Sequence, residues 1–493
     1  MKIGFDKEKY LSLQSELIMR RVEKFGGKLY LEFGGKLFDD FHASRVLPGF
    51  SPDSKIKMLH QLKDKAELVI VINAADIEKN KVRGDLGITY DLDVLRLIDA
   101  FQSIGMFVGS VVLNKYHSQP AADVFQKRLQ SLGVKVYRHY PIEGYPSNVP
   151  FIVSDDGYGK NEYIQTSRSL VVVTAPGPGS GKMAACLSQL YHDHKRGIKA
   201  GYAKFETFPV WNLALTHPVN IAYEAATADL NDVNMIDPFH LEAYGETAVN
   251  YNRDIEIFPV LNSIFEKIWG CSPYKSPTDM GVNMAGKCII DDESCRTAAE
   301  QEIIRRYYSA VCEKRKGLAD SDIVYKLELL MKQAKISSQD RQVVKACCDK
   351  ASATNKPATA IMLDDGRIIT GKTTSLLGAS SAMLLNALKT LADIPDEIHL
   401  IPPLVIEPIQ KLKTQHLDNK NPRLHTDEVL IALSISAATD KNAEKAIRQL
   451  YKLRGCEAHS SVILSQVDDA VFKKLGVNIT CEPQYESRRL FHK

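Results

Sequence analysis

The sequence predicts an α/β protein whose N-terminal domain is a mostly parallel, three-layer structure, with helices on both faces of a sheet. Two observations predict it. Short apolar, β-branched runs alternate with helical patterns over residues 1–235, and a glycine-rich turn at 177–182 follows one of these runs. A helical domain at 236–350 and an α+β domain at 351–493 are expected to follow, which suits a length of 493 residues.

Six strands are expected in the N-terminal domain, with the clearest helical periodicity at Asp91–Phe101 and Ala121–Leu132. Too few strands follow the glycine-rich turn to build a second sheet. We therefore expect the strand before the turn to join a sheet that begins near the N-terminus. The expected strands are Lys28–Phe33, Glu67–Ile72, Phe107–Leu113, Val134–Tyr137, Leu170–Thr174 and Lys199–Phe205.

Strand signals nearly vanish between 236 and 350, where three amphipathic helices are expected, and return after 351. The helices are Thr297–Lys314, Ser321–Ala334 and Ser338–Cys348. The last domain is expected to contain a hairpin within 358–372, helices at Leu376–Leu391, Pro408–Gln415, Asp427–Leu433 and Asn442–Leu453, and strands at Glu397–Ile401, His459–Leu464 and Val477–Cys481.

Composition excludes several classes of function. Lys plus Arg number 63 and Asp plus Glu number 60, so no strong basic field favours nucleic acid. No apolar run is long enough to span a bilayer, and the first residues lack the apolar segment of a signal peptide. The 9 cysteines include no C-x-x-C pair, which argues against a disulfide framework or a ribbon-type zinc site. A cytoplasmic protein with reduced thiols is expected.

The turn after Leu170–Thr174 is the strongest functional signal, because a strand, a glycine-rich turn and a helix start together form a phosphate site. Glycines let backbone N–H groups face inward, the helix start adds partial positive charge, and a lysine reaches the outer phosphate oxygens. The residues predicted to bind a small phosphorylated ligand are Gly177, Gly179, Ser180, Gly181 and Lys182.

The turn departs from a P-loop at two positions. Pro176 stands where the first glycine is expected, and Met183 replaces the serine or threonine whose hydroxyl binds Mg²⁺. Ser180 or Thr174 are the available substitutes. The alternative is a turn that merely packs closely against its neighbours. By contrast, Gly366–Thr373 matches the P-loop spacing but reads as a hairpin turn followed by a strand, and we interpret that match as accidental.

Polar residues after the first strand are candidate substrate contacts, because the carboxyl ends of parallel strands line the ligand crevice. These residues are Glu32, Lys36, His42 and Arg45, and a solvated loop is the alternative. Lys36, after two glycines, is preferred for an anionic group.

Three acids could provide the Mg²⁺ site or the catalytic base that Met183 leaves unfilled. Asp76 and Asp85 follow the second strand and are candidate metal ligands. Glu206 ends the strand after the turn's helix and is, with Asp76 and Lys182, a candidate catalytic residue. For any single acid, a helix cap or a salt bridge is the ordinary alternative.

Metal binding by histidine is not favoured by the sequence. Cys456 and His459 offer half a zinc site, but no second pair lies at a suitable spacing, so His459 is interpreted as structural and no zinc is expected.

Long strings closely resemble the bacterial domain-of-unknown-function 1846 family, also called uncharacterised protein family 0371, over essentially the whole chain. Among them are LYLEFGGKLFDDFHASRVLPGF (29–50), TAPGPGSGKMA (174–184) and SPTDMGVNMAG (276–286). This resemblance implies a cytosolic multidomain α/β protein that forms homo-oligomers, and it implies no particular activity.

Two local resemblances are less specific. The turn at 174–182 resembles the P-loop of formyltetrahydrofolate synthetase and related ligases, with Ser180 in place of an acid and Met183 in place of a hydroxyl residue. The region 358–388 resembles the start of a cytidine-deaminase-type fold, but Gly378–Ser381 stands where the zinc-binding and catalytic residues would be, so deamination is disfavoured.

Two functional hypotheses follow. The first is an enzyme for phosphoryl transfer or ligation that uses ATP or another nucleotide with Mg²⁺. The second is a non-hydrolytic ligand-binding protein or oligomeric scaffold, which Met183 favours.

Overall fold

The computed structural model describes residues 2–35, 37–38, 40–83 and 86–487. The chain forms two compact units, residues 2–299 and 300–493. The segment 236–350, expected as a helical domain, is divided between them, and helix α13 (Asp292–Arg315) runs across the boundary.

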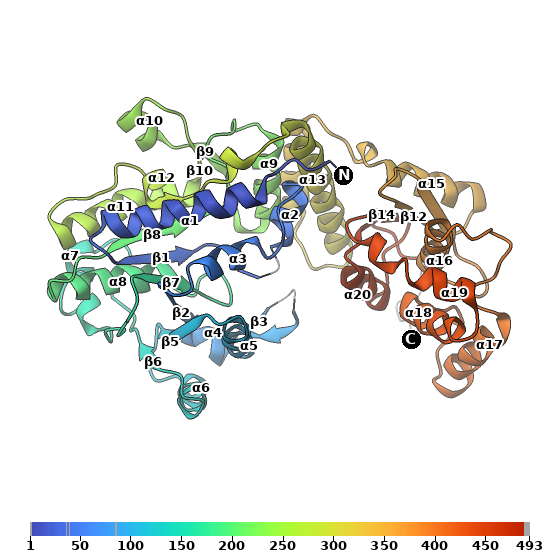
Figure 1. The fold of residues 1–493 in the computed structure, drawn as a ribbon, viewed down its shortest axis with the longest axis horizontal. Helices are drawn as coiled ribbons and strands as arrows, with labels where there is room; N and C mark the ends of the chain where they lie inside the picture. The colour runs from blue at the N-terminus through green and yellow to red at the C-terminus, as the bar shows by residue number, and fades with distance from the viewer. Residues whose placement is uncertain (1, 36, 39, 84–85, 488–493) are drawn as a thin grey trace. The chain divides into compact units, whose positions relative to one another are not determined.

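A seven-stranded sheet with the order β11-β8-β1-β7-β2-β5-β6 forms the centre of the 2–299 unit, and all its strand pairs are parallel (Figure 1). The strand of the glycine-rich turn, β7, joins the sheet that begins near the N-terminus, as expected, and it lies between the first two strands of the chain. Strand β11 is two residues long, too short to be recognised in the sequence. The strands are β1 (Leu29–Phe33), β2 (Ala66–Asn73), β5 (Phe107–Asn114), β6 (Val136–Arg138), β7 (Leu170–Thr174), β8 (Gly201–Phe205) and β11 (Gly281–Val282).

The mixed α/β fold with a large parallel sheet is thus confirmed, and each of the six expected strands is present within two residues of its predicted ends. Buried parallel strands read as continuous apolar runs because helices cover both of their faces. In β7 all five residues are buried.

Helices cover the two faces of this sheet. Helices α8 (Lys182–Lys195) and α11 (Asn252–Trp269) form a core with alternate residues of the central strands, including Tyr30, Val173 and Tyr202. Helix α3 (Ser54–Gln61) lies on the opposite face, beside stacked Phe33 and Phe205. The remaining helices are α1 (Lys7–Lys24), α2 (Phe41–Val46), α4 (Ala74–Glu78), α5 (Tyr90–Ser103), α6 (Pro120–Ser131), α7 (Val149–Ile152), α9 (Pro218–Ala226), α10 (Pro238–Tyr244) and α12 (Pro277–Met280), and two small antiparallel pairs join β3 (Val82–Arg83) to β4 (Ile88–Thr89) and β9 (Asn234–Ile236) to β10 (Val249–Tyr251).

Successive strands are added to the sheet in opposite directions on the two sides of the β1–β7 pair. The connection after β1 leads past β7 to β2, whereas the connection after β7, through α8, leads past β1 to β8. Right-handed crossovers in opposite directions place their helices on opposite faces, and ligands of open α/β sheets commonly bind at the carboxyl ends of strands where the direction reverses in this way. The glycine-rich turn therefore lies at a topological switch point.

The 300–493 unit contains a four-stranded sheet with the order β13-β12-β14-β15. The expected hairpin is present as antiparallel β12 and β13, so the P-loop-like string at 366–373 is a turn and a strand. The strands are β12 (Ala358–Met362), β13 (Ile368–Lys372), β14 (Glu457–Ser460) and β15 (Asn478–Cys481), and the helices are α14 (Ser321–Ala334), α15 (Gln342–Thr354), α16 (Ala379–Leu391), α17 (Pro403–Lys411), α18 (Thr426–Ala437), α19 (Lys441–Ile447) and α20 (Gln466–Leu475).

The strand predicted at Glu397–Ile401 is wrong, because this segment forms turns and bends. Leu400 and Ile401 are buried in the core of the unit, which explains their apolar character. Pro402 and Pro403 follow directly and have no N–H to donate to a strand ladder.

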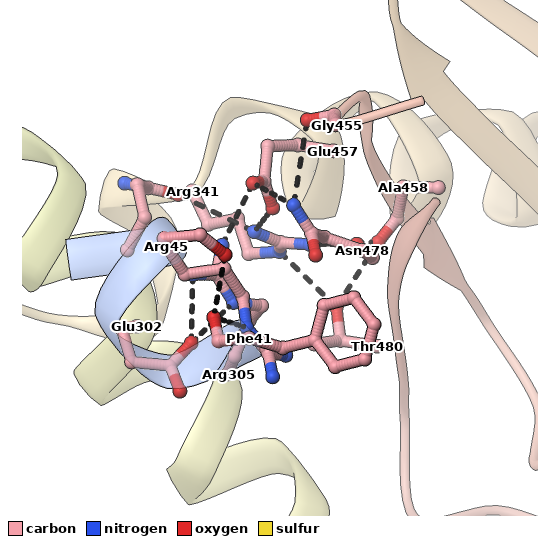
Figure 2. Close-up of polar contacts among 12 residues, drawn as sticks. Phe41, Arg45, Glu302, Arg305, Arg341, Gly455, Glu457, Ala458, Asn478 and Thr480 are labelled. Carbon is pink, nitrogen blue, oxygen red and sulfur yellow. Dashed lines mark hydrogen bonds and ion pairs between the residues drawn. The ribbon is translucent and has the colours of Figure 1, made fainter. Parts of the chain in front are cut away.

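A buried ion-pair cluster joins α13, α15 and the sheet of the 300–493 unit (Figure 2). Glu457 on β14 pairs with Arg305, at 2.7 Å, and with Arg341. Arg341 also donates to the backbone oxygens of Ala458 and Asn478, at 3.0 and 2.7 Å.

Candidate functional site

The turn between β7 and α8 is held in place through its carbonyl oxygens. Asn114, at the end of β5, donates from Nδ2 to the oxygen of Ser180 at 3.0 Å, and the Ser180 hydroxyl donates to the oxygen of Gly177 at 2.8 Å. Gly179 and Gly181 have φ angles of +75° and +93°, in the left-handed region that favours glycine. Gly181 is the residue that caps α8.

The backbone N–H groups at this helix start have no acceptor within the described part of the chain. The first hydrogen bond into α8 is from Ala185 to the oxygen of Gly181, and the N–H groups of residues 179–184 make none. Lys182, the first residue of the helix, is half-buried and forms no hydrogen bond or ion pair with described residues. Several donors and one cation are therefore available to an anion at the switch point.

Two glycines of the turn allow close packing by neighbouring side chains. A Cβ atom at Gly181 would lie 1.8 Å from Asn114 Nδ2, and one at Gly177 would lie 2.3 Å from the Tyr90 hydroxyl. The Lys81 ammonium lies over the Tyr90 ring, 4.9 Å from its centroid. Lys81 therefore brings a second cation near the turn.

A buried charged cluster forms at the carboxyl end of β8. Lys204 makes ion pairs with Glu206, at 3.0 Å from Oε1, and with Asp254 on α11, and it also contacts the Tyr251 hydroxyl. Burial disfavours the Lys204 ammonium, but Asp254 and its other neighbours outweigh burial and hold the pKa of Lys204 well above its ordinary value. One cation thus balances the buried carboxylate of Glu206 and the partly buried carboxylate of Asp254.

Glu32 on β1 connects this cluster to the glycine-rich turn. It lies beside Lys204 of β8 and Val173 of β7 in the strand register, so the three side chains share the α8 face of the sheet. The Tyr202 hydroxyl donates to Glu32 at 2.6 Å. Burial raises the pKa of Cys186, one turn into α8, with Glu32 adding to the rise and Lys182 opposing it, which indicates that both charges lie near this thiol.

The pKa of Glu206 is raised to about 7. Burial is the largest cause, Asp254 adds to the rise, and Lys204 opposes it. A carboxyl group with a pKa near neutrality can accept or release a proton at physiological pH. The cluster therefore combines a proton-exchanging acid with a fixed cation.

We expect the Glu206→Gln variant to lose part of the pH dependence of stability. Because the folded pKa of Glu206 is raised, the folded state binds more protons than the unfolded state between pH 4.5 and about 7. The wild type should therefore lose about 1–3 kcal/mol relative to the variant as pH rises through this window. Urea denaturation of both proteins at pH 5, 6, 7 and 8 measures the difference. Parallel pH curves would contradict the assignment.

The structure brings some of the predicted site residues together and separates others. Glu32 and Glu206 lie at adjacent strand ends around Lys204. Asp76 forms an ion pair with Lys81, at 3.4 Å. Lys36 and Asp85 lie outside the described residues.

His42 and Arg45 lie on α2. The His42 ring makes an edge contact with Phe208, with centroids 5.1 Å apart, and Phe208 stacks on Tyr223. Arg45 donates from Nε to the oxygen of Phe41, at 3.0 Å, within the same helix. Among the described residues, neither His42 nor Arg45 forms a hydrogen bond or ion pair with Lys182.

Sequence reasoning missed Lys204, Asp254, Asn114 and Tyr90. Lys204 is a charged residue inside an apolar strand, and Asn114 is the polar end of another, so both gave a weak signal. Asp254 lies fifty residues from Lys204 in the chain, and no spacing pattern links the two.

Two cavities lie elsewhere in the 2–299 unit. One, of about 290 Å³, is lined by Arg20, Arg21 and Lys24 of α1 and by Asp279, among others. The other, of about 590 Å³, lies between α10 and α11. Neither cavity includes the glycine-rich turn. The candidate site is therefore defined by the N–H groups of the turn and by the charged cluster around Lys204.

The fold and site define an α/β protein with a glycine-rich turn at a topological switch point. The family described as domain of unknown function DUF1846, N-terminal, matches residues 3–335, and its C-terminal counterpart matches residues 339–491. The chain belongs to this family.

Relatives described as UPF0371 proteins match the whole chain. One from Corynebacterium efficiens is 58% identical over 494 residues, covering 100% of both chains. One from Corynebacterium diphtheriae is 59% identical and one from Streptococcus pyogenes 57%, each covering 100% of this chain and 99% of its own. Among the described residues, no helix combines the length and apolar character needed to cross a membrane.

Proposed function

We propose that the turn at 177–182 binds the phosphate group of a nucleotide or other small phosphorylated metabolite. The observation that carries this proposal is the set of N–H groups at residues 179–184 that have no acceptor among the described residues. Such donors gain free energy when an anion accepts from them, and the start of a 14-residue helix adds its dipole. Lys182 supplies the formal charge.

The neighbouring cluster supports a reaction at the bound phosphate. Lys204 stabilises negative charge, and Glu206 is the candidate base or acid, because its pKa lies near neutrality. In this hypothesis the enzyme catalyses phosphoryl transfer or ATP-dependent ligation, with a P-loop-like turn and with Mg²⁺ accompanying the nucleotide. Asp76, already paired with Lys81, and Glu206 are the described acids among the candidates for the Mg²⁺ site.

The structure of the turn argues against Ser180 as the Mg²⁺ ligand that replaces the hydroxyl missing at Met183. The Ser180 side chain is fully buried, with its hydroxyl directed to the oxygen of Gly177, at 2.8 Å, within the turn itself. Thr174 is also buried. This arrangement favours the second candidate function, a protein that holds a phosphorylated ligand without hydrolysing it, as an oligomeric sensor or scaffold. The finer likeness of the 300–493 unit to a deaminase-type fold adds no activity to either candidate.

Replacing Lys182 by alanine is expected to weaken phosphate-ligand binding by about 10–100-fold, because a charge-assisted hydrogen bond to phosphate is lost. Isothermal titration calorimetry with ATP, ADP and inorganic phosphate, each with and without Mg²⁺, measures the change. The matched control is Lys195→Ala at the other end of α8, where Lys195 pairs with exposed Asp155 at 3.1 Å. The control should bind like the wild type.

Equal affinities for Lys182→Ala and the wild type would reject the site, as would a wild type that binds none of the three compounds. Incubation of the purified protein with ATP or GTP and Mg²⁺ separates the two candidate functions. Turnover supports the enzyme, and a ligand retained without turnover supports the binding protein.

A further inference from the structure

A thiol, an imidazole and a carboxylate converge in the 300–493 unit. Cys348 lies on α15, His459 on β14, and Glu482 directly after β15. One ligand atom from each lies within 4.8 Å of the other two. His459 Nε2 is 3.2 Å and Cys348 Sγ is 3.9 Å from the same Glu482 oxygen, Oε1.

These separations suit a tetrahedral zinc ion. Zinc bonds of about 2.3 Å to sulfur and about 2.0–2.2 Å to nitrogen and oxygen place neighbouring ligand atoms roughly 3.3–3.7 Å apart. The separations of 3.2 and 3.9 Å bracket that range. A mixed set of thiolate, imidazole and carboxylate favours zinc over Mg²⁺ or Ca²⁺, which take oxygen ligands.

Hydrogen bonds through Thr480 orient the His459 imidazole for metal binding. The Thr480 hydroxyl donates to the oxygen of Ala458, at 3.2 Å, and accepts from Arg341 Nε, at 3.1 Å (Figure 2). With its proton in use, it accepts from His459 Nδ1, 2.8 Å away. This network assigns the ring proton to Nδ1 and leaves the Nε2 lone pair facing Glu482.

A lone pair and a carboxylate oxygen 3.2 Å apart need a proton or a cation between them. A metal ion satisfies both groups without placing the charge on the buried ring, whose exposure is 0%. Tyr308 further orients the carboxylate, because its hydroxyl donates to Glu482 Oε1 at 3.2 Å and its ring lies 4.8 Å from the His459 ring.

We propose that Cys348, His459 and Glu482 bind one zinc ion, with water as the fourth ligand. Cys348 and Glu482 are only half-buried, which leaves the fourth position open to solvent. When zinc binds, the Cys348 thiol releases its proton to solvent and becomes the thiolate ligand. The Cys456 thiol instead donates to the oxygen of Lys452, so the partner of His459 comes from 111 residues earlier in the chain.

Two measurements test the site in the full-length protein. Elemental analysis of untagged protein purified without chelators should find about one zinc per chain. Co²⁺ added to the metal-free protein should produce a thiolate-to-cobalt charge-transfer band and the strong visible absorption of a tetrahedral complex. Cys348→Ser should abolish the charge-transfer band, and Glu482→Gln should keep it while weakening Co²⁺ binding at least tenfold.

The matched control is Cys347→Ser. Cys347 is adjacent in the chain, but its thiol donates to the oxygen of Ala358, at 3.2 Å, in the core. The control should retain the band and the zinc content, and circular dichroism should show that each variant is folded. If Cys348→Ser fails to fold, the half-buried, isosteric Glu482→Gln variant decides. A wild type without a cobalt band, an unchanged band in Cys348→Ser or unchanged affinity in Glu482→Gln would overturn the site.

Discussion

Replacing Arg341 by methionine is expected to destabilise the 300–493 unit by about 3–5 kcal/mol, because the substitution breaks a buried ion pair and removes several hydrogen bonds at once. Arg341 is 1% exposed and is held by Glu457 and by backbone oxygens of β14 and β15. Methionine fills much of the volume but supplies no donor. The Asn478 oxygen and one Glu457 oxygen would each lose a partner.

The two arginines together keep Glu457 charged in the core. Burial opposes ionisation of this carboxyl group, but Arg305 and Arg341 outweigh burial and hold its pKa below the ordinary value. In the variant, Arg305 and the Asn478 amide, at 2.7 and 2.9 Å, are the remaining partners. Glu457 therefore keeps part of its charge compensation. Because the lost partner is buried, the expected loss of unfolding free energy is still well above that for an exposed ion pair.

Hydrogen exchange on peptides that cover β14 and β15 measures this loss locally. The control is Arg448→Met, which removes an exposed arginine paired with Glu444 four residues earlier, at 2.6 Å, and should cost less than about 0.5 kcal/mol. Similar protection in wild type and Arg341→Met would show that the buried cluster adds little to stability.

The central sheet could be predicted because its signals are local. The central strands are mostly apolar runs, and β7 and most of β2 (Ala66–Asn73) are buried on both faces. The hairpin of β12 and β13 was likewise predicted from Asp364-Asp365-Gly366 and the β-branched residues after it. The failed strand at Glu397–Ile401 had the apolar content of a strand but no ladder partner, which only tertiary structure reveals.

The candidate sites were less predictable because their chemistry depends on distant residues. Glu32 and Glu206 were identified from their positions at strand ends, yet Lys204, which lies beside both, has its other carboxylate partner on α11. Likewise, His459 lies beside Glu482 because the parallel strands β14 and β15 bring residues 459 and 480–482 together. Its cysteine neighbour is Cys348 of α15 rather than Cys456, which is nearby in the chain. Spacing along the chain does not encode these pairs.

Replacing Lys204 by methionine is expected to destabilise the 2–299 unit by about 3–5 kcal/mol near pH 8. The substitution leaves buried Glu206 and partly buried Asp254 as neighbouring carboxylates without their shared cation. Like charges in a buried site cannot both stay ionised cheaply, so at least one must take up a proton as the protein folds. The folded pKa values of this pair should therefore rise further above the unfolded values.

The sign of the pH dependence follows from that rise. Raised carboxylate pKa values mean that the folded state binds more protons, so stability falls as pH increases from about 4 upward and the cost of the substitution is smaller at pH 5 than at pH 8. Denaturation followed by tryptophan fluorescence suits this measurement, because both tryptophans, Trp211 and Trp269, lie in the 2–299 unit. Lys199→Met, at an exposed position shortly before β8, is the control and should shift stability by less than about 0.5 kcal/mol at either pH.

The double variant Lys204→Met with Glu206→Gln tests whether the effect is electrostatic. Removing the second charge relieves the repulsion, so the double variant should be more stable at pH 8 than Lys204→Met alone and should show a weaker pH dependence. A purely steric role for Lys204 predicts instead that the two losses add and that the loss caused by Lys204→Met does not change with pH. A non-additive, pH-dependent outcome would show that Lys204 acts through its charge rather than its bulk. The same ammonium would then be available to stabilise negative charge on a ligand beside Glu32.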